Sequence, residues 1–288
     1  MASADQGPIG KFRLGRVIGT AAAFLRRNAI FSIAVSTIFF VLPPVLIDLS
    51  IVTYWAKLAN QLGAVGGGTW AFAVNLSLNL IAKLVGMVPN FLGQAVLARA
   101  TLDDVNGNRP SVGICIQAAL RQLLPVLSIG VVFYFGVFFA VFGSSAGTRL
   151  VSPETGGFMF LILIVFVVVW GVGSSVAIPV AVREGLATVA SIARSRALTK
   201  GYRWRIFGLV SVVMIGLALV LWIGVELGFA WMPSRRLPQS ALVLISVRWA
   251  ILSAIAWTVL SIALAATYAE LLRVKEGFGV DELSQIFS

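Results

Sequence analysis

Six apolar runs of about 20 residues or more constrain this chain most strongly, because a helix of that length crosses about 30 Å of hydrocarbon. The runs predict helices near 29–55, 71–98, 117–142, 158–182, 206–231 and 243–269. Of the 288 residues, 59% are hydrophobic and only 11% are charged, too few to cover a soluble domain of this length. The sequence therefore predicts an all-α polytopic membrane protein with six transmembrane helices.

Lys and Arg are divided unevenly between the two ends of these helices. Sixteen lie in the N-terminal segment, the second and fourth connections and the C-terminal tail, whereas five lie in the other connections. Since basic loops favour the cytoplasm, both termini are expected there. The net charge of +11 then reflects topology, and no nucleic acid is expected as a partner. The first apolar run has no cleavage-site pattern, so it is expected to be an uncleaved signal anchor.

The residue types present limit the chemistry of the chain. It has no His and a single cysteine, Cys115, so the commonest general base and metal ligand is missing and no intrachain disulfide can form. No nucleophile is paired with a base. We expect no catalytic residues, no metal site and no cofactor, and an intramembrane enzyme is the least favoured function.

An approximate threefold hairpin repeat is predicted from three similar approaches to outward-going helices. They cover 14–33, 112–131 and 188–210, and each combines small and apolar residues with cationic ones. The returning helices place Arg99, Arg183 and Arg273 at the boundary, and a glycine follows each within eight residues. The predicted unit is a short amphipathic helix, an outward helix and an inward helix. Any hairpin protein with basic cytoplasmic loops would look similar, so that alternative stays open.

The stretch between Gly185 and Gly201 is predicted to be an interfacial helix. At helical spacing it carries Leu186, Val189, Ile192, Ala193 and Ala197, while Thr188, Arg194 and Ser195 fall on its remaining surface. One transmembrane domain is expected over 1–288. Its expected cytoplasmic parts are an amphipathic N-terminal segment, the interfacial helix and a tail, at 1–28, 185–201 and 270–288.

Basic and aromatic residues around this helix are candidate contacts for anionic headgroups of membrane lipids or for a partner protein. They are Arg183, Arg194, Arg196, Lys200, Tyr202, Arg203, Trp204 and Arg205. The alternative is that they set topology and anchor the helix without binding anything in particular.

A second candidate site lies inside the membrane. Lys83 is in the middle of an apolar run, and ionisable groups at such depth usually face a partner or a water-filled cavity. Asn75 and Asn79 share its helix face, and Asp48 and Glu226 are candidate counter-charges. Prolines that are expected to interrupt four of the helices would free carbonyls beside them: Pro43, Pro44, Pro89, Pro125 and Pro179. A polar transport path and a hydrogen-bonded helix contact are both open.

Two stretches resemble a group of six-helix bacterial inner-membrane proteins similar to the membrane domain of glycerophosphoryl diester phosphodiesterases. The first is "IPVAVREGLATVASIARSRALTKGYRWRIFGL", with Pro179, Glu184, Gly185, Arg194, Ser195, Leu198, Thr199, Gly201 and Trp204. The second is "YAELLRVKEGFGVDELSQIF", with Tyr268, Glu270, Arg273, Lys275, Glu276 and Gly277. The resemblance implies six helices in a bacterial inner membrane but no defined activity. The catalytic domain of glycerophosphoryl diester phosphodiesterases is absent from this sequence.

Two functions are therefore weighed. The first is a non-enzymatic scaffold, accessory or assembly subunit that contacts lipids and membrane proteins, with a homo-oligomer as one of its forms. The second is a small transporter or channel for a lipid, an amphiphile or a small solute, which rests on Lys83 and the prolines.

Overall fold

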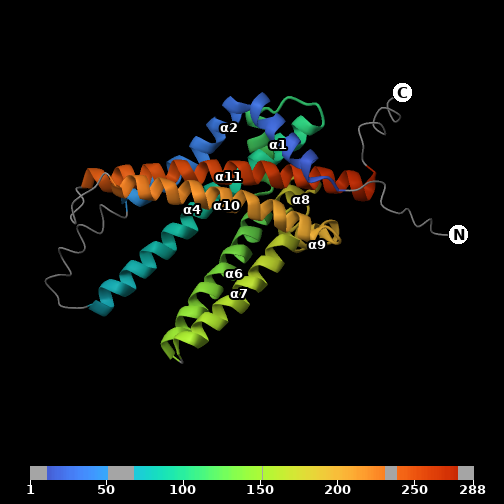
Figure 1. Cartoon of the computed structure of the whole chain (residues 1–288). Coiled ribbons are helices and arrows are strands. Elements are labelled where there is room, and N and C mark those ends of the chain that lie inside the picture. Colours follow the sequence, from blue (N-terminus) through green and yellow to red (C-terminus); the bar gives the residue numbers. More distant parts are fainter. Residues whose placement is uncertain (1–11, 51–67, 151, 231–238, 278–288) are drawn as a thin grey trace, which may run out of the picture.

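The computed structural model describes residues 12–50, 68–150, 152–230 and 239–277, and every regular element in these ranges is helical (Figure 1). The elements are α1 (Leu14–Arg27), α2 (Ala29–Ser36), the π-helical turn η1 (Thr37–Val41), α4 (Gly68–Val105), α5 (Val112–Arg121), α6 (Leu123–Leu150), α7 (Pro153–Ser174), α8 (Ala177–Glu184), α9 (Thr188–Thr199), α10 (Arg203–Ala230) and α11 (Gln239–Glu276). A further helical stretch covers 42–50. The predicted all-α class is confirmed for this part of the chain.

Several helices are long and apolar enough to cross a membrane. Among the described residues these are Ala29–Ser50, Gly157–Glu184 and Ser246–Glu276. The pair Val112–Arg121 and Leu123–Gly136, bent by 68°, makes a fourth if it is counted as one broken span. All of them overlap apolar runs identified in the sequence. The described chain is thus an all-helical protein with three to four candidate membrane-spanning helices.

Prolines affect these helices in different ways. Pro43 and Pro44 lack the N–H groups that would bond carbonyls four residues earlier, and the wider turn η1 ends two residues before Pro43. Pro179 lies in the first turn of α8, where its missing N–H costs no helical bond. Pro89, by contrast, lies inside the continuous helix α4 and does not end it. The expectation that Pro89 interrupts its helix is therefore wrong.

Helix α11 links two groups of buried side chains. One group surrounds α4 and includes Phe24, Phe40, Leu97, Ile129 and Ile262, and the other surrounds the end of α11 and includes Val17, Val180, Leu198, Ile206, Tyr268 and Leu271. Helices α6 and α7 run side by side as a hairpin that extends away from α10 and α11 (Figure 1). The short helices α1 and α9 both contact the C-terminal end of α11.

Glycines allow the helices of the first group to touch closely. A Cβ on Gly93 of α4 would lie 2.6 Å from Cε1 of Phe40, and a Cβ on Gly130 of α6 would overlap the ring of Phe91. The aromatic rings therefore lie directly on helix backbone, a type of contact common in membrane helix bundles.

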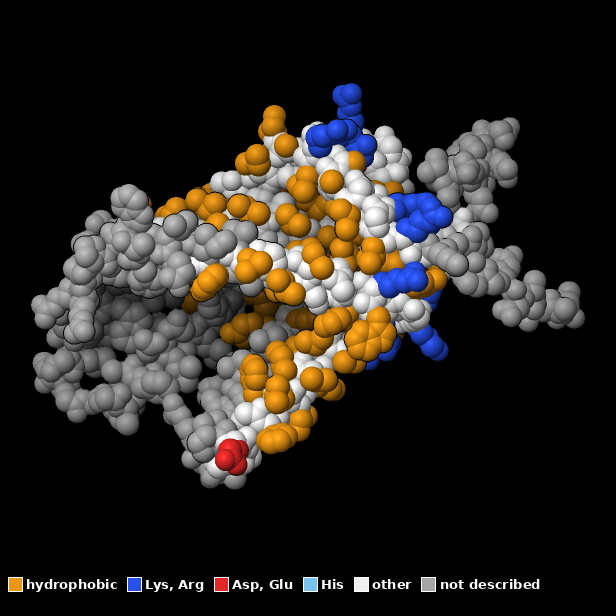
Figure 2. Space-filling model, viewed as in Figure 1, with side chains coloured by type: hydrophobic (Ala, Val, Ile, Leu, Met, Phe, Trp, Pro, Cys, Tyr) orange, Lys and Arg blue, Asp and Glu red, His pale blue; other side chains and the backbone are white. Residues whose placement is uncertain are grey.

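The basic side chains visible in Figure 2 gather at the end of the molecule that carries α1 and α9. Hydrophobic side chains cover most of the described surface beyond this end, and the acidic side chain in view lies at the far tip of the α6–α7 hairpin. In this view the exposed basic side chains are therefore concentrated at one end of the described molecule.

Candidate functional site

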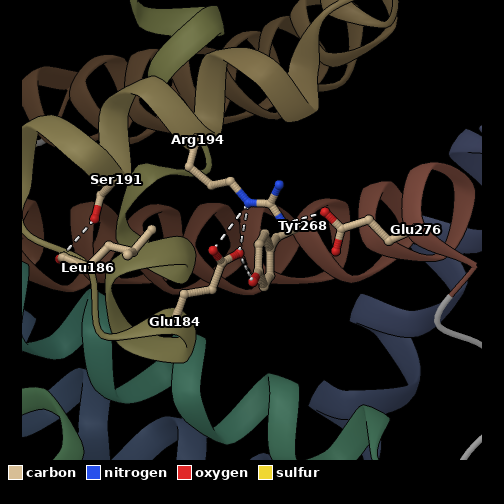
Figure 3. A network of polar contacts seen from close by, with 6 residues as sticks. All are labelled: Glu184, Leu186, Ser191, Arg194, Tyr268 and Glu276. Carbon is tan, nitrogen blue, oxygen red and sulfur yellow. Dashed lines mark hydrogen bonds and ion pairs between the residues drawn. The ribbon is translucent and has the colours of Figure 1, made fainter. Parts of the chain in front are cut away.

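Four side chains form a polar cluster, the Arg194 cluster, where α8, α9 and α11 meet (Figure 3). Arg194 Nε donates a hydrogen bond to Oε2 of Glu184 at 3.1 Å, and its Nη2 donates to Oε1 of Glu276. Tyr268 Oη donates to Oε1 of Glu184 at 2.7 Å. One guanidinium thus joins carboxylates from two helices that are far apart in the sequence.

Two left-handed glycines place these carboxylates. Gly185, with φ of 68°, ends α8 immediately after Glu184, and Gly277, with φ of 70°, follows Glu276 at the end of α11. Glycine adopts this conformation at little cost and so ends helices readily. Each glutamate therefore lies in the last turn of its helix, within reach of α9.

The electrostatics of Arg194 match a structural role. Burial by itself lowers the pKa of a guanidinium, but hydrogen bonds and charges from Glu276 and Glu184 outweigh it and raise the pKa of Arg194 above its ordinary value. The side chain is 34% exposed, and the two carboxylates are 23% and 25% exposed. Arg194 is thus a fixed cation that ties α9 to the ends of α8 and α11.

A row of small polar residues fixes α9 to the break between α7 and α8. The Gly173 carbonyl lies in the last turn of α7, where it has no partner within the helix. It accepts hydrogen bonds from Ser195 Oγ at 3.0 Å and Thr199 Oγ1 at 3.3 Å, and both side chains are buried. The prediction that Ser195 faces outward is therefore wrong, because its hydroxyl is needed by this carbonyl.

A second polar cluster, the Glu270 cluster, fixes the start of α1 to α11. The Glu270 carboxylate is 3% exposed. It accepts hydrogen bonds from two guanidinium nitrogens of Arg273, at 2.8 and 2.9 Å, and from the backbone N–H of Arg13 at 3.3 Å. Arg16 lies 3.7 Å from the same carboxylate. Buried carboxylates need such partners, so this end of α1 is firmly placed.

A third cluster, the Asp104 cluster, holds the junction between α1 and α2. Asp104, near the end of α4, accepts hydrogen bonds from Arg27 Nη2 at 2.5 Å and from Asn28 Nδ2 at 3.0 Å. All three clusters therefore join a short helix, or the end of one, to the end of a long helix.

Half of the basic and aromatic residues predicted for lipid or partner contact take part in polar or cation–π contacts within the chain. These are Arg194, Arg196, Tyr202 and Arg205. Arg196 lies over the Trp170 ring at 5.8 Å, and Arg205 lies over the Tyr202 ring at 5.9 Å. Arg205 Nη1 also donates to the Phe12 carbonyl at 2.8 Å.

The other half remain available at the surface. Arg183, Lys200 and Arg203 are exposed and form no ion pair with any residue that the structure describes. Trp204 is 85% exposed. These four are thus the better candidates for an external contact.

The predicted intramembrane site stays a prediction. Asn75, Asn79 and Lys83 lie on α4 and Glu226 lies on α10, but their side chains are outside the described residues. Asp48 is half-buried in the helical stretch 42–50. The structure thus brings none of these side chains demonstrably together.

Sequence reasoning did not assign Glu184, Glu270, Tyr268 or Glu276 to a site, although all four were among the residues that carry the family resemblance. A signal was present, since "VREG" at 182–185 and "VKEG" at 274–277 repeat the same pattern. Their glutamates bind the same arginine, and the repeated tetrapeptide could have suggested that they are neighbours.

The described residues hold no group of three or more His, Cys, Asp and Glu side chains that could bind a metal ion. Comparisons of the chain with protein-family models, with curated proteins and with solved structures gave no match, so the family resemblance stays a prediction.

Proposed function

We propose that the chain is a non-enzymatic integral membrane protein that acts as a scaffold, accessory or assembly subunit through lipid and protein contacts. The observation that carries this proposal is that the paired charges of the described chain, most of them partly buried, join helices to one another. The Arg194, Glu270 and Asp104 clusters all hold short helices in place at one end of the molecule. Ion pairs that fix the positions of helices also fix the surface that these helices present to a partner. Catalysis would instead require side chains placed to react with a substrate.

Three short helices, α1, α5 and α9, each keep a large apolar side chain exposed. Ile18 of α1 is 56% exposed, Ile114 of α5 is 58% exposed and Val189 of α9 is 80% exposed. Such side chains favour a bilayer interface or a partner protein over water. Short helices that expose apolar and basic side chains, two of them held by the charged clusters, support a role in binding.

We further propose six membrane crossings, with both termini in the cytoplasm of a bacterial inner membrane. The three spans and the bent pair account for four of these crossings. The other two are α4 and α10, of 38 and 28 residues, which are also long enough to cross. The basic end of Figure 2 supports the orientation, and the bacterial membrane rests on the family resemblance. A threefold repeat is supported by the left-handed glycines Gly107, Gly185 and Gly277, each directly after or two residues after the end of a returning helix.

The experiment is purification of the full-length tagged protein from its native membrane in a mild detergent. A scaffold or accessory subunit should retain a stoichiometric protein partner or form a homo-oligomer. Replacing Val189 with Arg should weaken that association, whereas Asn108→Arg, which adds the same charge in the exposed turn between α4 and α5, should not. A lone monomer that brings no protein with it would contradict the proposal.

A further inference from the structure

Two exposed cations, Lys200 and Lys275, lie together where α9 and α11 meet, and a third, Arg203, follows Lys200 at the start of α10. Lys275, in the last turn of α11, donates a hydrogen bond from Nζ to the Ala197 carbonyl at 2.5 Å. This contact places its ammonium at the last turn of α9, and Lys200 directly follows that helix. Lys200 is also one of the charges that act most strongly on Lys275. Arg203 begins α10 three residues later.

Within the described residues, no carboxylate neutralises these cations. Lys200, Arg203 and Lys275 are exposed and are absent from the ion pairs of the described chain. The nearby Glu276 is engaged by Arg194. Like charges held close together without a counter-ion disfavour one another, so an anion bound here would stabilise the arrangement.

An apolar stripe begins beside these cations and runs along α10. Trp204 is 85% exposed, and Val212, Ile215 and Leu219 are 69%, 60% and 52% exposed. Their spacing of eight, three and four residues keeps all four on one face of the helix. The Trp204 ring meets the edge of Phe207 with centroids 6.0 Å apart. Tryptophan favours the level of lipid headgroups, where its ring lies between polar and apolar surroundings.

We propose that Lys200, Arg203 and Lys275 bind the phosphate of an anionic phospholipid whose acyl chain lies along the stripe that starts at Trp204. This proposal rests on the proposed membrane function and names its lipid partner. A phospholipid has anionic and apolar parts in the same order as the cations and the stripe. Free phosphate would match the cations alone, and a neutral lipid would match the stripe alone.

The test measures lipid retained by the purified full-length protein. The protein is exchanged into a neutral detergent with equal amounts of phosphatidylglycerol and phosphatidylcholine, and bound lipid is counted by native mass spectrometry. Wild type should retain phosphatidylglycerol preferentially, and a tenfold excess of inorganic phosphate should not displace it. Since one basic residue near an anionic surface changes affinity about fivefold, the triple variant K200Q/K275Q/R203Q should bind about a hundredfold more weakly.

A matched triple variant removes the same charge elsewhere. Arg26, Arg109 and Arg121 are exposed and form no ion pair with described residues, so R26Q/R109Q/R121Q should keep the lipid. Trp204→Leu should also weaken retention, and circular dichroism should show unchanged helix content in every variant. Equal losses in the two triple variants, displacement by free phosphate or no preference in wild type would overturn the proposal. Loss of the lipid with the protein partner still bound would separate this site from the proposed scaffold function.

Discussion

Arg194 of α9 is bonded to Glu276 of α11, a residue 82 positions further along the chain. The same guanidinium is bonded to Glu184, ten residues earlier. One side chain thus fixes α9 against the ends of both the short helix α8 and the long helix α11. The end of the molecule that carries most of the visible basic charge is held together by a buried or half-buried set of acidic residues.

Replacing Arg194 with Gln should destabilise the protein by about 1.5 kcal/mol, the lower end of the range for hydrogen bonds to charged groups, because the site is about one-third exposed. Glu184 and Glu276 would be left facing each other without their shared cation. Thermal unfolding in detergent, followed by circular dichroism, measures the change. Arg203→Gln removes one exposed cation from a neighbouring position and should leave the transition unchanged, so equal shifts in both variants would contradict the assignment.

Ser195→Ala and Thr199→Val should be non-additive. Either hydroxyl alone can satisfy the Gly173 carbonyl, so each single change is expected to cost well under 1 kcal/mol, whereas the double change leaves a buried carbonyl without a donor and should cost about 2 kcal/mol. A double-mutant cycle of unfolding free energies gives the coupling. Simple additivity would mean that the carbonyl has another donor.

The sequence predicts the all-helical class and several long apolar helices, but few of the contacts between them, for a physical reason. A helix that crosses a membrane needs about 20 apolar residues in a row, so α7 and α11 can be predicted from their apolar runs alone. Burial of Ser195 depends on a carbonyl 22 residues away, and the Arg194 cluster depends on where α11 ends. Such contacts follow from three-dimensional packing, and local spacing carries little information about them.

Replacing Glu270 with Gln should loosen the start of α1. The carboxylate is 3% exposed and holds Arg273, Arg16 and the Arg13 N–H, so loss of its charge should cost about 2 kcal/mol, less than for a fully buried pair because both guanidiniums are partly exposed. Hydrogen exchange should rise at α1 and remain unchanged at α9.

Glu276→Gln provides the opposite case for that experiment. Its carboxylate contacts Arg194 on α9, so exchange should rise at α9 and remain unchanged at α1. If both variants loosened both helices, the two clusters would be parts of one cooperative unit and their separate roles would be contradicted.

Gly130→Ala should destabilise the protein although alanine favours helices. The added methyl group would overlap the ring of Phe91, which must then move within a packed contact, at a cost of about 1–3 kcal/mol that exceeds the gain of up to about 1 kcal/mol in helix propensity. Gly136→Ala is the matched control on α6, because its nearest neighbour is 4.0 Å away and the propensity gain should dominate. The expected result is a lower Tm for the first variant and an equal or higher Tm for the second. Two increases would mean that Phe91 yields at little cost and that α4 and α6 are not held by this contact.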